Sequence, residues 1–256
     1  MAGVSLLDAL LDLAAGTVCV GCARPGRVLC LACEAALPLR PRAARPTPRP
    51  AGLAPTVAAG GYDDPVVRAM VIAHKERRAF ALARPLGDLL ASAAAGLVER
   101  PCLAGSRVLL VPVPSRPAVV ARRGHDPVQR VARRAAARLR AAGHDVRAVD
   151  VLRQSERPQD QGDLGGAQRR ENVRRTMAAR GAALRRLARE GAPVAAVVVD
   201  DVVTTGSTAR EAQRALAAVG VSVAGIACVA ATDVRTAGDG SPPIAYRRPM
   251  EPDSAI

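Results

Sequence analysis

The segment spanning residues 195–209 constrains the fold more than any other part of this chain. The apolar run Val197–Val199 is typical of a buried parallel strand. Two adjacent carboxylates, Asp200 and Asp201, follow at the carboxyl end of this run. A glycine shortly after them, Gly206, permits a tight turn into a helix. The segment therefore predicts a strand, a polar turn and a helix in that order.

The turn and the start of the helix after it are suited to binding an anion. Amides in the first turn of a helix have no intrahelical partners and attract phosphate groups. We expect Ser207 and Thr208 to cap this helix, which the sequence predicts over residues 209–219. Hydroxyl groups add further donors, which favours a phosphate monoester over a diffuse negative surface. The predicted phosphate-binding residues are Thr204, Thr205, Gly206, Ser207 and Thr208.

The two carboxylates suit a different part of a ligand. A phosphate close to Asp200 and Asp201 would be repelled, whereas a diol or a magnesium ion would be bound. A phosphate beside a diol is a ribose 5-phosphate. The alternative is an ordinary capped helix start with two solvated acids, and the unbroken order of acids, threonines, glycine and hydroxyls argues against it.

Four of the six cysteines form two closely spaced pairs near the N-terminus, Cys19 with Cys22 and Cys30 with Cys33. Four thiolates at this spacing can complete the tetrahedral shell of a structural zinc ion. A disulfide or redox role is the alternative, but disulfides do not persist in the cytosol and a redox pair needs no second knuckle. The sequence therefore predicts a small zinc module.

Composition limits the classes of partner. The formal net charge of +14 permits attraction to nucleic acid, but an aromatic content of 1% leaves no platform on which bases could stack. Lys75 is the only lysine, and the abundance of arginine reflects a chain-wide bias. We therefore interpret the arginine pairs as solvated helix faces. The isolated histidines, His74, His125 and His144, are likewise expected to face solvent.

Alternating strand and helix patterns predict an α/β fold with a doubly wound, mainly parallel sheet. Strands are expected at 56–62, 107–113 and 146–152 besides the acid-bearing strand, and helices at 65–74, 82–98 and 127–141. We expect a zinc knuckle module (1–37), an extended, exposed Pro/Arg-rich linker (38–55), the main domain (56–232) and a disordered tail (233–256). No apolar stretch is long enough to span a membrane without interruption, which predicts a cytoplasmic protein.

Three further segments carry a resemblance to a known family. Val-Pro-Val-Pro114 is followed by Ser115-Arg116, Leu152-Arg153 comes later, and a polar stretch spans residues 161–172. With the four cysteines and the acid-bearing turn, these segments resemble the ComF family of phosphoribosyltransferase-like proteins. The resemblance covers residues 19–231, and the turn itself is similar to the phosphoribosyl-pyrophosphate (PRPP) loop of type I phosphoribosyltransferases.

The resemblance implies a role for each segment. Asp200 and Asp201 would hold the ribose 2′ and 3′ hydroxyls, the turn at 204–208 the 5-phosphate, and Ser115 and Arg116 the pyrophosphate, with magnesium bound alongside PRPP. Residues 161–172 would form part of a mobile hood. The reaction implied is displacement of pyrophosphate at ribose C1. The family is also associated with DNA uptake during natural transformation, beside a helicase-like ATPase.

Two departures from the family pattern leave the function open. Many relatives carry Arg-Gly-Phe-Asn-Gln where residues 123–127 read Arg-Gly-His-Asp-Pro, and Thr204 stands where 6-oxopurine transferases have a base-contacting aspartate. No residue identifies the acceptor nucleophile. A phosphoribosyltransferase, a non-catalytic sensor of PRPP or a nucleotide, and an accessory protein that binds DNA or a motor protein are the three hypotheses.

Overall fold

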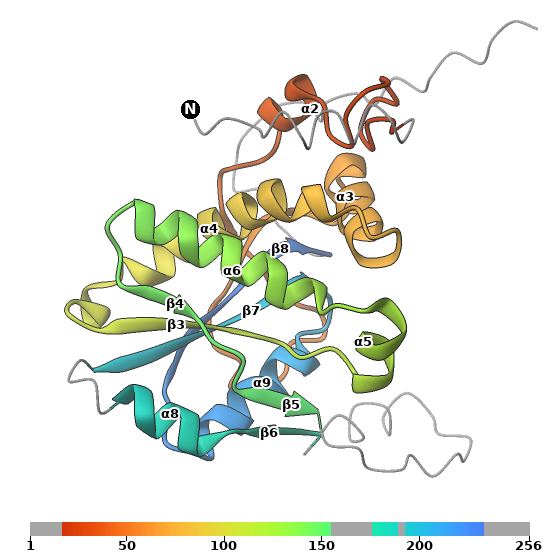
Figure 1. Ribbon diagram of the computed structural model, residues 1–256. Coiled ribbons are helices and arrows are strands. Elements are labelled where there is room, and N and C mark those ends of the chain that lie inside the picture. The colour runs from red at the N-terminus through yellow and green to blue at the C-terminus, as the bar shows by residue number, and fades with distance from the viewer. Residues whose placement is uncertain (1–16, 155–175, 189–192, 233–256) are drawn as a thin grey trace, which may run out of the picture.

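The computed structural model describes residues 17–154, 176–188 and 193–232 (Figure 1). A six-stranded sheet has the order β1-β2-β8-β7-β3-β4, and β5 and β6 form a separate antiparallel pair. Strands β2, β8, β7, β3 and β4 run parallel, and β1 is antiparallel at one edge. The strands are β1 (Arg42–Ala43), β2 (Thr56–Gly61), β3 (Arg107–Pro112), β4 (Val146–Ala148), β5 (Leu152–Gln154), β6 (Met177–Ala179), β7 (Val194–Val203) and β8 (Val223–Ala231).

Helices cover both faces of the large sheet, which confirms the predicted doubly wound, mainly parallel α/β fold. In Figure 1, α3, α4 and α6 lie on one face, and α9 lies on the other together with β5, β6 and α8. The helices are α2 (Leu31–Ala35), α3 (Pro65–Glu76), α4 (Ala83–Val98), α5 (Pro117–Arg123), α6 (Pro127–Ala141), α8 (Gly181–Ala188) and α9 (Ser207–Ala217). The predicted hood segment (161–172), the predicted tail (233–256) and the first 16 residues lie outside the described residues.

Strand β7 is buried on both faces, which explains its uninterrupted apolar run. Val197 and Val199 pack into the layer of α3, α4 and α6, whereas Ala196 and Val198 pack toward α9. Successive side chains of a strand point to opposite faces, so an alternating polar pattern would leave one of these layers without a partner.

Asp-Pro pairs start two of the helices where the sequence predicts them. Asp64 accepts hydrogen bonds from the amides of Val66 (2.8 Å) and Val67 (3.0 Å) at the start of α3. Asp126 accepts one from the amide of Gln129 (3.1 Å) at the start of α6. In both helices the proline that follows the cap occupies a first-turn position that needs no amide donor.

The predicted strand at 146–152 is wrong in its continuity. Val146 pairs with Val108 of β3, and the pairing ends at Ala148, where the chain leaves the sheet. Leu152 then pairs with Ala179 of β6, in the layer that covers the α9 face of the large sheet. A change of layer within six residues cannot be read from an apolar pattern that suits either partner.

The segment at 38–55 differs from the expected exposed linker. Residues 42–43 add β1 to the sheet beside β2, and Ala44, Pro46, Leu53 and Ala54 are buried. Hydrogen bonds between the side chain of Gln213 on α9 and the backbone of residues 52 and 54 hold the segment. Its few apolar residues find partners on α9, so the proline-rich segment forms a strap across this face. The predicted domain boundaries on either side remain predictions.

One helical segment among the described residues, Phe80–Val98, is long and apolar enough to cross a membrane. It contains Arg84 and Asp88, and 61% of its most apolar window is buried inside the protein. Its buried side packs against α6 and β8. These contacts are those of a core helix.

Two glycines of α4 provide a test of the contact between α4 and α6. A Cβ at Gly87 would lie 2.5 Å from Cβ of Arg134 and 3.3 Å from the amide nitrogen of Ala135, whereas a Cβ at Gly96 would meet nothing within 4 Å. We expect Gly87→Ala to lower the free energy of unfolding by about 1–3 kcal/mol because the helices must separate. Gly96→Ala, the matched control, should raise it by about 0.4–1 kcal/mol. Urea denaturation measures both, and equal effects would contradict the proposed close contact.

Candidate functional site

The acid-bearing turn and the Val-Pro-Val-Pro loop meet at one edge of the sheet. Strands β3 and β7 are parallel neighbours, with Pro112 opposite Val199, and the amide of Val113 donates to the carbonyl of Val199 (2.9 Å). The loop that carries Ser115 therefore leaves the sheet beside Asp200. Carboxyl ends of parallel strands are the usual place for a ligand in such folds.

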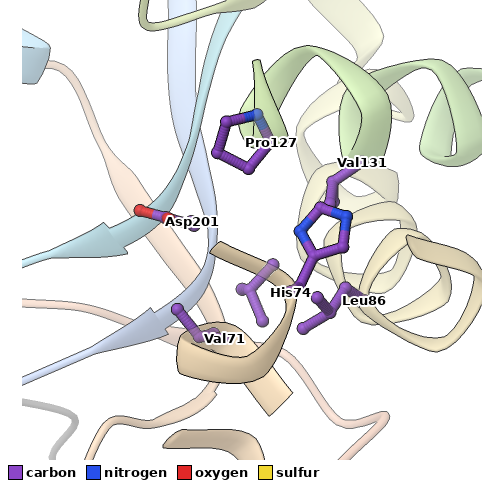
Figure 2. A pocket seen from close by; sticks show the side chains of 7 residues that line it. Val71, His74, Leu86, Pro127, Val131 and Asp201 are labelled. Atoms are coloured by element: carbon purple, nitrogen blue, oxygen red, sulfur yellow. The ribbon is translucent and has the colours of Figure 1, made fainter. Parts of the chain in front are cut away.

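The two acids lie within β7, which continues to Val203 rather than ending before them. Asp201 faces the layer of α3, α4 and α6. Its Oδ2 lies 2.7 Å from Nζ of Lys75 on α3, and its carboxylate borders a cavity of about 10 Å³ that His74 also lines (Figure 2). Asp200 pairs in register with Cys228 of β8 and is half-buried.

Burial gives the acid pair unusual electrostatics. Desolvation raises the pKa of Asp200 well above its ordinary value, and the adjacent negative charge of Asp201 raises it further. Desolvation also opposes the charge of Lys75, but attraction to Asp201 and Asp200 outweighs it and raises the pKa of the ammonium. Lys75 is therefore a fixed positive charge beside two acids, and Asp200 is the acid that gains a proton most readily.

The predicted phosphate-binding turn (residues 204–208) leads into its helix differently from the prediction. Gly206 is the N-cap, with a φ of +71°, and Ser207 is the first residue of α9, so the expected capping by Ser207 and Thr208 is wrong. Gly206 has no side chain with which to cap the helix, so apart from a weak bond from the Ser207 amide to Thr205, the described residues give the first-turn amides no side-chain cap. Thr205 Oγ1 accepts weakly from the Ser207 amide (3.4 Å) and lies 3.1 Å from Ser207 Oγ, while Thr204 and Thr208 are exposed.

Gly206 is required for space as well as for backbone conformation. It is buried beneath the strap, and a Cβ there would lie 2.8 Å from Cδ2 of Leu53 and 3.3 Å from Cβ of Pro46. The strap (residues 38–55) therefore packs against the predicted phosphate-binding turn.

Ser115 and Arg116 lie in the neighbouring loop. The amide of Ser115 donates to Oδ2 of Asp126 (3.0 Å), the same carboxylate that caps α6, and Arg116 is exposed at the start of α5. The carbonyl of Pro114 accepts from the side chain of Gln154 on β5 (3.2 Å). One backbone donor of the loop is thus already occupied by a carboxylate.

A cleft of about 630 Å³ opens beside this loop. Ser115 and Asp126 line one part of it, and Asp150, Arg153 and Arg180 bring charges of both signs to other parts. A cleft of this size is sufficient for a small polar molecule.

The last turn of α3 contributes residues that the sequence analysis did not assign to the site. Lys75 pairs with Asp201, and Glu76 pairs with Arg123 at the end of α5. The preceding His74 contacts His125 edge to face, with ring centroids 6.1 Å apart. The one feature of the sequence that could have marked Lys75 as a site residue is that it is the only lysine of the chain.

Two of the histidines do not face solvent. His74 is 2% exposed and His125 is 9% exposed, and His125 also packs edge to face against Phe80 at 4.8 Å. The Nε2 atoms of both histidines are buried, and no residue that the structure describes gives them a hydrogen-bond partner. The expectation was wrong because their burial depends on the packing of α3 against the loop before α6, which no local pattern indicates.

The four paired cysteines form a cluster that could hold a metal ion. Their sulfur atoms all lie within 4.8 Å of one another, and the Cys22 and Cys30 sulfurs are 3.6 Å apart. Zinc–sulfur bonds of about 2.3 Å place tetrahedral ligands at similar separations. The donor set therefore fits a tetrahedral metal site.

Backbone amides prepare this cluster for thiolates. The amides of Gly21 (3.4 Å) and Cys30 (3.3 Å) donate to Sγ of Cys19. Burial acts to raise the pKa of Cys19, but these hydrogen bonds outweigh it and lower the pKa to about 6. A Cβ at Gly21 would lie 2.9 Å from Sγ of Cys33, so this position must be glycine. Cys19, Cys30 and Leu29 join the same core cluster as α3 and α4, which anchors the cysteine module to the sheet domain.

Comparison with protein families identifies one match. The family described as the phosphoribosyl transferase domain matches residues 83–246, a range that includes the acid-bearing turn and the Ser115 loop and excludes the four cysteines. No protein with a curated description matches the chain.

The buried His74 predicts a pH dependence of stability. Desolvation, with smaller contributions from His125 and Arg130, lowers its pKa from 6.5 to about 4. The unfolded chain therefore binds more protons between pH 6.5 and 4, and stability falls as the pH falls through this range, by at most about 1.4 kcal/mol per pH unit. We expect His74→Leu to remove this component.

Urea denaturation at several pH values between 7 and 4 measures the slope, and the difference between wild type and variant removes the contribution of other groups. Identical slopes in wild type and His74→Leu would contradict the assignment.

Proposed function

Because the chain belongs to the phosphoribosyl transferase domain family, we propose that it binds PRPP where β3 and β7 end. The observation that carries the proposal is the pairing of these strands, which puts two candidate anion-binding loops at one edge of the sheet. One loop has uncapped helix amides and hydroxyl groups, and the other borders a cleft of about 630 Å³. PRPP has a phosphate at one end, a pyrophosphate at the other and a diol between them.

Each part of the site matches one part of this ligand. The amides and hydroxyls of residues 204–208 would hold the 5-phosphate, because a helix N-terminus favours negative charge. Asp200 and Asp201 would accept hydrogen bonds from the ribose hydroxyls. Ser115 and Arg116 would face the pyrophosphate, where the exposed guanidinium of Arg116 can neutralise its charge.

The reaction that we propose is displacement of pyrophosphate at ribose C1. The bond from C1 to the pyrophosphate oxygen breaks, the electron pair leaves with pyrophosphate, and the acceptor nucleophile forms the new bond to C1. The residues of this chain would contribute by positioning the ribose through Asp200, Asp201 and the 5-phosphate turn, and by neutralising the leaving group through Arg116.

Magnesium would accompany the ligand rather than occupy a site of its own. Among the described residues, the four cysteines form the only group of three or more potential metal ligands. Magnesium is usually held by substrate phosphates, with few protein ligands, and such an arrangement fits a site without a carboxylate cluster. When bound, it would neutralise negative charge on the pyrophosphate.

A non-catalytic PRPP sensor is the second candidate, and one observation favours it. The carboxylate of Asp126 already accepts the Ser115 amide, so this donor is not free for pyrophosphate and a negative charge lies close by. A sensor would bind PRPP without releasing pyrophosphate. Release of pyrophosphate in the presence of acceptor candidates would decide for the enzyme.

We further propose that the four-cysteine cluster binds structural zinc and that the protein is of the ComF type. The cluster precedes the matched domain. The sequence resemblance to the ComF family implies the same order of parts. A role in DNA uptake, a DNA or helicase-like ATPase partner, and a cytoplasmic location are predictions from the sequence alone. The net charge of +14 is compatible with binding to DNA.

Replacement of both acids tests the PRPP site. We expect Asp200→Asn with Asp201→Asn to weaken binding of PRPP and magnesium at least about 10-fold, since hydrogen bonds to charged groups contribute about 1.5–3 kcal/mol each. Isothermal titration calorimetry measures the affinity. Asp145→Asn is the matched control, because Asp145 is an exposed acid paired with Arg107 at the other end of β3. The proposal is wrong if folded, metal-loaded wild type does not bind PRPP.

Zinc analysis tests the cysteine cluster. We expect one zinc ion per chain, released by a thiol-blocking mercurial and lost in Cys30→Ser, because three remaining thiolates leave the shell incomplete. The control is Cys102→Ser, which changes an exposed cysteine outside the cluster. Wild type purified with no zinc, and unable to take it up, would overturn this assignment.

A further inference from the structure

We propose that Lys75 is a positioning residue of the phosphoribosyl site: it holds Asp201 in place and supplies the positive charge that lets an anionic ligand approach two acids. The inference rests on the proposed function and extends it to a helix outside both loops. Lys75 lies at the end of α3, outside the region that the family match covers.

Composition marks this position as exceptional. The chain has 37 lysine and arginine residues, and Lys75 is the single lysine among them. An ammonium is a compact charge on a flexible stem, whereas a guanidinium is broad and planar. The ammonium of Lys75 reaches the Asp201 carboxylate of β7. Every other basic residue of the chain is an arginine.

The geometry fixes both oxygens of Asp201. Oδ2 lies 2.7 Å from Nζ of Lys75, and Oδ1 accepts the amide of Val202 at 2.8 Å. The carboxylate is 12% exposed and the lysine side chain 35% exposed, so the acid is largely buried while the ammonium is partly in contact with solvent. Because Lys75 holds one oxygen and the Val202 amide holds the other, the carboxylate has a single orientation.

Charge gives the pair its function. Asp200 and Asp201 stand next to a turn suited to phosphate, and without a nearby cation they would repel the ligand that they are proposed to bind. Lys75 attracts both acids and offsets this repulsion. Because the Asp201 carboxylate is only 12% exposed, loss of its partner also lowers stability, so binding is measured on variants that are shown to be folded.

Calorimetric titration of PRPP and magnesium into variants of the full chain tests the inference. We expect Lys75→Met to weaken binding about 10- to 100-fold, the effect of losing a hydrogen bond to a charged group. Lys75→Arg should recover part of the loss, because the charge remains but the shape differs. Arg68→Met is the matched control: Arg68 is an exposed cation on the same helix that lies over the ring of Tyr62 at 5.6 Å.

A double-mutant cycle separates positioning from a general charge effect. If Lys75 acts through Asp201, the double variant Lys75→Met with Asp201→Asn should lose less binding free energy than the sum of the losses in the two single variants. Additive losses, or wild-type affinity in Lys75→Met, would overturn the inference and leave the proposed function standing. Absence of PRPP binding by the wild type would overturn the proposed function and the inference with it.

Chemical labelling tests the pair without altering the lysine. An amine-specific acylating reagent modifies one internal peptide, because the chain has a single lysine. At pH 8 the reagent should label Lys75 several-fold faster in the Asp201→Asn variant than in the wild type, because removal of the carboxylate lowers the pKa of the ammonium. Equal rates would show that Asp201 does not hold Lys75 and would overturn the inference.

Discussion

Parallel pairing of β3 with β7 is the contact on which the rest of the structure depends. Both strands lie in the middle of the sheet and are buried on both faces, so their register decides which side chains reach each helical layer. A shift of one residue would send Asp201 to the face of α9, away from Lys75. The same register sets the Ser115 loop beside Asp200. The apolar core and the polar edge are therefore specified by one set of backbone hydrogen bonds.

The last turn of α3 connects β7 to α5 and to the loop before α6. Three consecutive side chains leave the helix in different directions: His74 toward His125, Lys75 toward β7, and Glu76 toward α5. Consecutive helical residues point about 100° apart, which is what allows one turn to contact three elements. The ends of α3, α5 and β7 are thus held together by short polar and aromatic contacts rather than by a continuous apolar surface.

Much of the fold could be predicted because its signals are local. The Asp126-Pro127 pair starts α6 where expected, and the apolar run of β7 marks a strand buried on both faces. The contact between Lys75 and Asp201 could not be predicted, because it joins a helix and a strand that only the sheet order brings together. The prediction for the cap of α9 was wrong because Gly206, in a left-handed conformation, is the N-cap and the helix begins at Ser207, two residues before the predicted start. The roles of the two loops in ligand binding remain predictions that the fold accommodates.

The strap (residues 38–55) and strand β2 belong to the folded sheet domain although they lie outside the region that the family match covers. The family match begins at residue 83, yet β2 pairs with β8 inside the sheet, and Pro46 and Leu53 cover Gly206 of the predicted phosphate-binding turn. The matched region and the folded unit of this chain are therefore different. A fragment trimmed to residues 83–246 would leave β8 with an unpaired edge and remove Pro46 and Leu53 from beside Gly206, so the start of the match is not a boundary of the folded unit.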